Sequence, residues 1–278
     1  MNAWKRTNRN CPCPVCGRTD WCMVAENGSV AICPRVETGA TKYLDGSGYL
    51  HVLDKSAPIP ERKDEHGVEL PEHNMVLSML SSKMMSACDD GRLSMMSDKL
   101  GLKPFAMRAL RVGWSASSDA FSFPMFRAGQ RLIGIRLRSL TGKKWAIKGS
   151  KQGLFMPFEW VSKSPGIVLC EGPTDTAAVL GLGINAIGRP SAMGSHALVE
   201  EAVKGRPVCV LSDSDSVGVD SANRLASHLI KSGACKSVGI LVPPAKDARE
   251  WISSGATREQ VKESIARAMK CDGPFVCR

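Results

Sequence analysis

Four carboxylates each follow an apolar, strand-like run in the second half of the chain: Glu171, Asp213, Asp215 and Asp247. In an open α/β sheet, the carboxyl ends of neighbouring strands border one crevice, so these side chains should converge there. Carboxylates at such short separation repel one another unless a hard divalent cation lies among them. One or two Mg²⁺ (or Mn²⁺) ions held in this way stabilise the attacking and leaving oxygens of phosphoryl transfer. The pattern therefore predicts a magnesium site that acts on phosphates.

Cysteines cluster near the N-terminus, where five of the eleven lie between Cys11 and Cys33. Cys13 and Cys16 form half of a zinc knuckle, with two thiolates on a tight turn, and Cys22 and Cys33 supply two more ligands around a hairpin-like segment. The spacing from Cys16 to Cys22 departs from the usual second Cys-x-x-Cys. Zinc would give this segment, which has little apolar content, its fold. Cys11 is a rival for any of the four positions. Redox-active or simply buried cysteines are the alternative interpretation.

The net charge of +10 comes from one block of the chain. Residues 101–163 contain twelve Lys and Arg but only two Asp and Glu. Such a one-sided block, directly before the acidic site, indicates a phosphate-binding surface. A solvated basic face is the simpler alternative.

Four regions are expected along the chain. Residues 1–57 form the cysteine-rich domain, and residues 58–74 form a polar linker with prolines. Residues 75–163 combine helical spacing with a strand hairpin around Ala128-Gly129-Gln130. Residues 164–278 form the acidic domain with a C-terminal helix. The apolar runs are too short to span a membrane and the N-terminus lacks a signal region, so we expect a cytoplasmic protein.

Strands and helices alternate through the acidic domain, which predicts a small, doubly wound α/β sheet. Strands are expected near residues 166–170, 185–188, 207–211 and 237–242. Helices are expected near residues 174–181, 195–203, 217–231, 246–253 and 257–270. Thr257, with Glu259 and Gln260 after it, is a suitable N-cap for the last helix.

The acidic motifs resemble the Toprim family, in which a Glu-Gly motif precedes an Asp-x-Asp motif in a compact α/β domain. The resemblance implies that Glu171 is the general acid/base and that Asp213 and Asp215 are metal ligands. Asp247 is implied as a further ligand, since Lys-Asp-Ala-Arg-Glu at 246–250 is similar to a stretch of phage primases. Asp175 matches a family aspartate that caps or orients the site.

The cysteine motif ahead of these acidic motifs makes the chain resemble bacterial and bacteriophage DNA primases. Phe-Pro-Met at 123–125, the segment 131–138 and the segment 144–151 are similar to primase motifs. The implied fold is mixed α/β: a zinc ribbon, a small basic α+β subdomain and a Toprim domain with a parallel sheet. The resemblance implies that four basic residues hold template or nucleotide phosphates: Arg138, Lys144, Lys148 and Lys151.

The resulting hypothesis is a DNA primase of the phage or mobile-element kind. It would join nucleoside triphosphates into short RNA primers on single-stranded DNA, with a separately encoded helicase as a partner. A Toprim nuclease and a non-catalytic recombination mediator are the alternatives. A strand-passing topoisomerase needs a tyrosine nucleophile. Both tyrosines of this chain lie in the cysteine-rich region, which argues against that kind of enzyme. The basic block at 101–163 favours a primase over a mediator.

Overall fold

The structure is a computed structural model of the 278-residue chain. It describes residues 4–20, 22–44, 48–56, 71–158, 166–191, 195–270 and 276–277. The chain divides into two compact units between residues 69 and 70, and each unit is described by itself. Of the predicted linker at 58–74, residues 58–70 lie outside the described residues, and the last four begin the first helix.

The N-terminal unit is built on one antiparallel sheet with the strand order β1-β2-β3-β5-β4. Its strands are β1 (Trp4–Arg6), β2 (Met23–Ala25), β3 (Val30–Cys33), β4 (Lys42–Leu44) and β5 (Gly48–Val52). The predicted hairpin is present, and Gly28 takes the left-handed conformation at its tip (φ 72°). Among the described residues of this unit, four buried side chains form the apolar core of the sheet: Ala25, Val30, Ile32 and Leu50. A core this small indicates that the unit needs a further source of stability.

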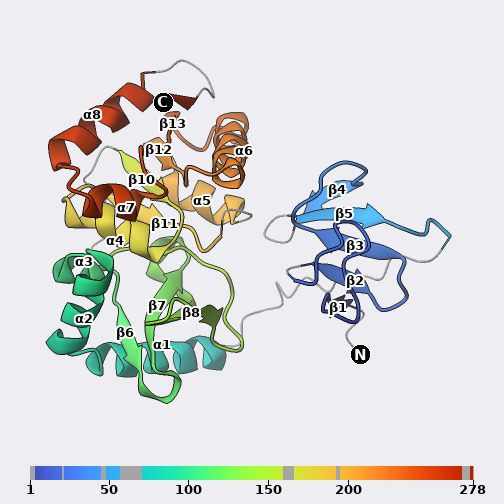
Figure 1. Ribbon diagram of the computed structural model, residues 1–278, viewed down its shortest axis with the longest axis horizontal. Coiled ribbons are helices and arrows are strands. Elements are labelled where there is room, and N and C mark those ends of the chain that lie inside the picture. Colours follow the sequence, from blue (N-terminus) through green and yellow to red (C-terminus); the bar gives the residue numbers. More distant parts are fainter. Residues whose placement is uncertain are drawn as a thin grey trace. The chain divides into compact units, whose positions relative to one another are not determined.

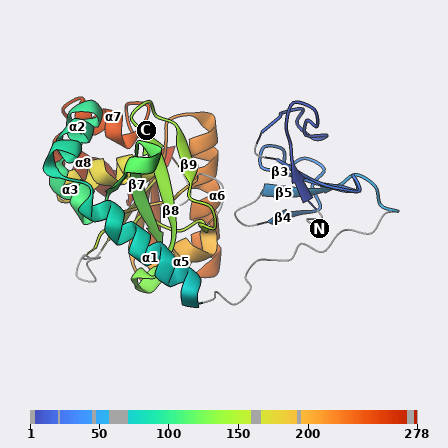
Figure 2. The same ribbon diagram turned by 90° about the horizontal axis from the view of Figure 1, so that it is seen from below.

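The second unit begins with three helices and an antiparallel sheet of order β6-β7-β8-β9 (Figure 1). The elements are α1 (Pro71–Ser86), α2 (Asp90–Leu100), α3 (Pro104–Ala109), β6 (Gly113–Ser115), β7 (Ala120–Phe126), β8 (Leu132–Ser139) and β9 (Lys144–Ala146). The predicted hairpin is β7–β8, in which Phe121 lies opposite Arg138. Helix α1 runs along this sheet, as Figure 2 shows from below. The buried faces of α2 and α3 pack on β7, so this helix pair serves the core.

The second half of this unit holds a parallel sheet with the strand order β11-β10-β12-β13-β14. Its strands are β10 (Ile167–Cys170), β11 (Ala186–Gly188), β12 (Pro207–Leu211), β13 (Ser237–Leu241) and β14 (Val276–Cys277). The helices are α4 (Pro173–Gly181), α5 (His196–Val203), α6 (Ser216–Ser232), α7 (Ala248–Ser253) and α8 (Arg258–Ala268). The four strands and five helices predicted from the sequence are confirmed, within a few residues at their ends.

Side-chain alternation along the strands assigns the helices to the two faces of the sheet. Ile167 and Leu169 pack in a core with α5, α6 and strand β8. Val168 and Cys170 pack in a second core with α4, α7 and α8. The sheet is therefore doubly wound, as the sequence predicts. Within the described residues, no helix is long and apolar enough to cross a membrane.

Candidate active site

Glu171 and Arg189 form a buried ion pair at the carboxyl edge of the parallel sheet. Each follows its strand directly, and the two strand ends are neighbours because Cys170 pairs with Gly188. The Arg189 side chain is fully buried, the Glu171 side chain is 9% exposed, and Arg189 Nη2 lies 3.3 Å from Glu171 Oε1. Arg189 also donates to Ser221 Oγ from α6. The carboxylate of Glu171 is thus held at one position by an arginine that cannot turn towards solvent.

Asp213 and Asp215 follow β12, the strand next to β10. Asp215 is the N-cap of α6, and its Oδ1 accepts a 2.7 Å hydrogen bond from the Gly218 N–H. A Cβ at position 218 would lie only 2.8 Å from the Asp213 carbonyl oxygen, so the glycine lets the helix start close against this loop. The Asp-x-Asp motif is therefore fixed by the first turn of α6.

Asp175 and Asp247 extend the acidic edge from α4 and α7. Asp175 is 7% exposed, and its Oδ1 accepts a hydrogen bond of 3.1 Å from the Arg249 N–H. Asp247 caps α7 by accepting a 2.7 Å bond from the Glu250 N–H, and it lies 3.5 Å from Arg249 Nη2. The cap explains why α7 begins at Ala248 rather than at the predicted residue 246. Asp175, which the resemblance implies only as a residue that caps or orients the site, is the most buried aspartate at this edge.

The carboxylates at this edge resist ionisation. Burial raises the pKa of Glu171 to about 7, with Arg189 opposing the shift. Burial and the neighbouring Asp247 raise the pKa of Asp175 to about 7. The same two causes, with Asp215, raise the pKa of Asp213 to about 6, against the attraction of Lys144. Such shifts follow when several carboxylates share a site with little solvent.

The donor set fits a hard divalent cation, because carboxylate oxygens are the ligands that Mg²⁺ prefers and a cation would relieve this repulsion. The carboxylates do not meet at one point, however. Among the described residues, only a group of cysteines brings three or more ligand atoms within 4.8 Å of one another. The edge thus offers separate ligands along the ends of the strands.

Two of the four predicted basic residues reach this edge. Arg138 on β8 lies opposite Lys144 on β9. Burial and Arg249 lower the pKa of Arg138, whereas Asp175 and Asp247 raise it. Burial and the positive charge of Arg138 lower the pKa of Lys144, and the negative charges of Asp175 and Asp213 only partly oppose this shift. Both cations therefore lie within electrostatic reach of the carboxylates.

The other two predicted basic residues follow β9 away from this edge. Lys148 is exposed. The backbone N–H of Lys151 donates to the Ile133 carbonyl, near the start of β8, whereas Arg138 is near its end. Arg138 and Lys144 consequently lie towards the acidic edge, and Lys148 and Lys151 lie farther from it along β8 and β9.

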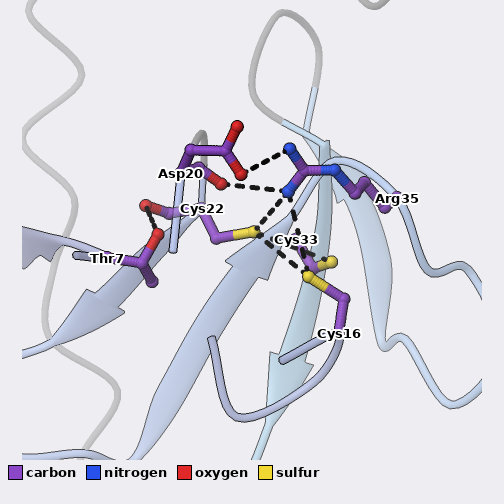
Figure 3. A network of polar contacts seen from close by, with 6 residues as sticks. All are labelled: Thr7, Cys16, Asp20, Cys22, Cys33 and Arg35. Carbon is purple, nitrogen blue, oxygen red and sulfur yellow. Dashed lines mark hydrogen bonds and ion pairs between the residues drawn. The ribbon is translucent and has the colours of Figure 1, made fainter. Parts of the chain in front are cut away.

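The four predicted thiolates of the N-terminal unit come together, and Figure 3 shows three of them, Cys16, Cys22 and Cys33. The Sγ atoms of Cys13, Cys16, Cys22 and Cys33 all lie within 4.8 Å of one another, with 3.6 Å between Cys16 and Cys22. A tetrahedral zinc site with bonds of about 2.3 Å places its sulfurs about 3.8 Å apart, so the group fits zinc. Cys11 is outside this group and pairs through its backbone with Asn8.

Arg35 lies against two of these sulfurs, as the dashed lines in Figure 3 show. Its Nη1 is 3.5 Å from Cys22 Sγ and 3.9 Å from Cys16 Sγ. The Asp20 carboxylate holds the other end of the guanidinium at 2.9 Å. Burial opposes ionisation of Cys16, but the Arg18 backbone and the neighbouring thiols outweigh it and lower its pKa to about 7. Burial and the neighbouring thiols instead raise the pKa of Cys22 and of Cys33. Of these three thiols, Cys16 is therefore the one most readily converted to the thiolate, the form that binds metal.

Sequence reasoning missed three arginines at the acidic edge. Arg189 follows an apolar strand directly, as Glu171 does. A search for any charged residue after an apolar, strand-like run would therefore have found it. Arg136 precedes Arg138 by two residues on β8, and its Nη1 donates to the Pro190 carbonyl. Arg249 lies between Asp247 and Glu250, in the segment whose aspartate is predicted as a metal ligand.

Comparisons with known proteins give structural matches only. No protein-family model and no curated protein matches the chain. The zinc-binding and RNA polymerase domains of Aquifex aeolicus primase match over 96% of this chain and 79% of that one, with 16% identity and a TM-score of 0.59. A DnaG catalytic core covers 71% of this chain and 80% of its own, with 16% identity and a TM-score of 0.57.

A DnaG primase catalytic domain bound to single-stranded DNA has 14% identity, a TM-score of 0.57, and coverage of 71% of this chain and 81% of that one. The chain therefore has the fold of the bacterial primase catalytic core, with a four-cysteine site typical of a zinc ribbon ahead of it.

Proposed function

We propose that this chain is a DNA primase, which joins ribonucleotides into short primers on single-stranded DNA. The observation that carries the proposal is the carboxyl edge of the parallel sheet. There, Glu171, Asp213 and Asp247 lie within electrostatic reach of one another or of the cations Arg138 and Lys144. The primase fold over 96% of the chain supports the polymerising form of this chemistry.

The proposed reaction is the attack of a 3′-hydroxyl on the α-phosphate of a nucleoside triphosphate. A P–O bond forms to the 3′-oxygen, the bond to the β-phosphate bridge breaks, and pyrophosphate leaves. One or two Mg²⁺ or Mn²⁺ ions, with Glu171, Asp213, Asp215 and Asp247 as the ligands along this edge, would supply charge neutralisation for the attacking and leaving oxygens. Positioning and charge account for most of the rate in such reactions, and they are what this edge provides.

Each residue of the edge has a distinct role in the proposal. The pKa of Glu171, about 7, allows its carboxylate to accept a proton near neutral pH, so it serves as general acid/base. Arg189 keeps that carboxylate in position from the buried side. Arg138 and Lys144 hold phosphate oxygens of the incoming nucleotide, and Lys148 and Lys151, farther from the edge, bind phosphates of the template.

The partners of the proposed enzyme follow from this chemistry. The template is single-stranded DNA, the ligand of one similar catalytic domain. The N-terminal unit, with Zn²⁺ on its four cysteines, would help to hold that template. Nucleoside triphosphates are the substrates, and a separately encoded helicase is a further partner. The enzyme is of the phage or mobile-element kind and acts in the cytoplasm.

Primer synthesis tests the proposal. Purified zinc-loaded protein, single-stranded DNA, labelled ribonucleotides and Mg²⁺ or Mn²⁺ should give short oligoribonucleotides. Asp213→Ala should abolish them, and Glu171→Gln should slow synthesis by about 10²–10⁴-fold. The matched control is Asp220→Ala, because Asp220 is an exposed aspartate on α6. Its activity should equal that of the wild type.

Two other outcomes would replace the proposal. Cleavage of the DNA without synthesis would identify a Toprim nuclease. Binding of the DNA without synthesis or cleavage would identify a recombination mediator.

A further inference from the structure

A pocket lies between helix α2 and the turn that joins β8 to β9. It has a volume of 160 Å³, and its walls come from the C-terminal half of α2 and from the end of β8 with the turn after it. An apolar cavity of about 150 Å³ is large enough to hold a benzene ring. The pocket can therefore receive one heterocyclic ring of similar size.

Apolar side chains form much of the pocket wall. Met96 and Phe121 are buried, and Leu100 and Leu140 are half-buried. Trp114 holds the Phe121 ring in place by an edge-to-face contact, with 5.0 Å between the ring centres. Apolar walls of this kind suit the faces of a flat ring, as in most sites for small organic ligands.

Polar groups line the same pocket. Lys99 is exposed in the last turn of α2, and Thr141 is exposed on the turn opposite. Ser139 Oγ lies 2.8 Å from Thr141 Oγ1 and accepts a hydrogen bond of 3.1 Å from the Lys143 N–H. Ammonium and hydroxyl groups can donate to the carbonyl oxygens and ring nitrogens at the edge of a nucleobase.

The turn that forms one wall is fixed by its own backbone. The Ser139 N–H donates to the Lys143 carbonyl, and the Gly142 N–H donates to the Ser139 carbonyl, each at 3.0 Å. Gly142 has a φ of 92°, which glycine adopts without the strain that a side chain would cause. A wall that is already ordered loses little conformational entropy when a ligand binds.

Arg138 connects the pocket to the acidic edge. Its side chain lines the pocket and lies within electrostatic reach of Asp175 and Asp247. The end of α2 contacts α7, the helix that Asp247 caps, because a Cβ at Gly101 would lie 2.7 Å from the Cβ of Ser253. A nucleotide whose base lies in the pocket can therefore extend its sugar and phosphates towards Arg138 and the proposed metal ligands.

We propose that the pocket between α2 and the β8–β9 turn binds a nucleobase beside Arg138. The base can belong to a nucleoside triphosphate or to the single-stranded DNA template. The inference rests on the proposed function for the assignment of nucleotides to the acidic edge, and it adds a site for the base. Binding measured without synthesis separates a failure of the pocket from a failure of primer synthesis.

Calorimetry with two ligands isolates the contribution of the base. One ligand is uridine triphosphate with a methylene group between its α- and β-phosphates, so that no transfer takes place. The other is inorganic tripolyphosphate, which has the phosphates but no base. Both are titrated in Mg²⁺ without DNA.

Two variants change the pocket, and each has a matched control. Thr141→Trp fills the pocket from an exposed position, whereas Thr141→Ala removes the same hydroxyl without filling it. Lys99→Met removes the ammonium group and keeps the assay decisive if Thr141→Trp fails to fold. Its control is Lys83→Met, at an exposed lysine of α1 outside the pocket.

If the base of a nucleoside triphosphate binds, Thr141→Trp should weaken the uridine analogue about tenfold and leave tripolyphosphate unchanged. Lys99→Met should weaken the analogue about threefold, and more than it weakens tripolyphosphate. Both controls should bind as the wild type does.

Oligo-dT and an abasic oligomer of equal length test the template as the source of the base. If a template base binds, Thr141→Trp weakens oligo-dT about tenfold, while the abasic oligomer and the uridine analogue bind as before. Either pattern supports the pocket, and with either one a protein that makes no primers would contradict the proposed function alone. Binding of the analogue and of oligo-dT that is unchanged in both pocket variants, or that falls only as much as for the ligands without bases, would overturn the proposal.

Discussion

Replacing Arg189 by Met should make the stability of the chain more sensitive to alkaline pH. Arg189 is fully buried and lies 3.3 Å from Glu171. In a medium of effective dielectric constant about 20, charges at this distance attract by about 5 kcal/mol. In the variant, the buried Glu171 carboxylate loses this attraction, and its pKa rises further above the value of about 7 that burial already gives it.

The size of the effect follows from proton linkage. A carboxyl group with a raised pKa contributes stability below its unfolded pKa, and this stability is lost as the pH rises through the folded pKa. At pH 5.5 Glu171 is protonated with or without Arg189, because its pKa is about 7 in the wild type. Above pH 7 the free energy of unfolding of the wild type falls no further through Glu171, because this group is already ionised. That of the variant continues to fall by about 1.4 kcal/mol per pH unit, because its Glu171 has a higher pKa. The deficit of Arg189→Met should therefore be about 2 kcal/mol larger at pH 8.5 than at pH 5.5.

Urea unfolding at both pH values, without added divalent cations, measures this difference. In the Glu171→Gln background the pH-dependent part of the deficit should disappear, because no carboxylate remains to titrate. Arg127→Met, at an exposed arginine, should show no deficit at either pH. A deficit of Arg189→Met that is equal at pH 5.5 and pH 8.5 would refute the coupling between Arg189 and Glu171.

Three other predictions concern the metal sites. Cys22→Ser should remove bound zinc and unfold the sheet of the N-terminal unit, measured by metal analysis and proteolysis, while residues 70–278 keep their melting temperature. Arg35→Met should weaken zinc binding about tenfold in competition with a chromophoric chelator, because the donor to Cys22 and Cys16 is lost. Mg²⁺ should raise the melting temperature more at pH 8 than at pH 5, since Glu171, Asp175 and Asp213, with raised pKa values, are deprotonated only at the higher pH. Equal shifts at both pH values, or an equal shift in Asp213→Asn, would contradict that last prediction.

The sequence was sufficient for the elements that carry a local signal. The β10 and β12 strands are short apolar runs, and the acidic residues directly after them mark where they end. Thr257 forms the expected cap of α8, in a capping box with Gln260. Strand β14 was not predicted, because a two-residue strand after a helix has no periodicity to recognise.

Long-range register explains what the sequence could not give at the site. Arg189 is beside Glu171 only because β11 pairs with β10 on the outer side of the sheet. Lys144 reaches the acidic edge because β9 pairs with β8 so that Lys144 lies opposite Arg138. The composition of the basic block is the same in any strand register. Only the pairing of β9 with β8 shows that Lys144 lies at the acidic edge and that Lys151 does not.

Mass spectrometry of the 5′ end of the product tests the proposed polymerising site most directly. A primase starts a chain by using the 3′-hydroxyl of one nucleoside triphosphate, so its first nucleotide keeps its triphosphate. Wild-type protein on single-stranded DNA with Mg²⁺ or Mn²⁺ should therefore give oligoribonucleotides with a 5′-triphosphate, and Asp213→Ala should give none. Products that contain deoxyribose from the template, or no product under conditions in which the protein binds the DNA, would contradict a primase.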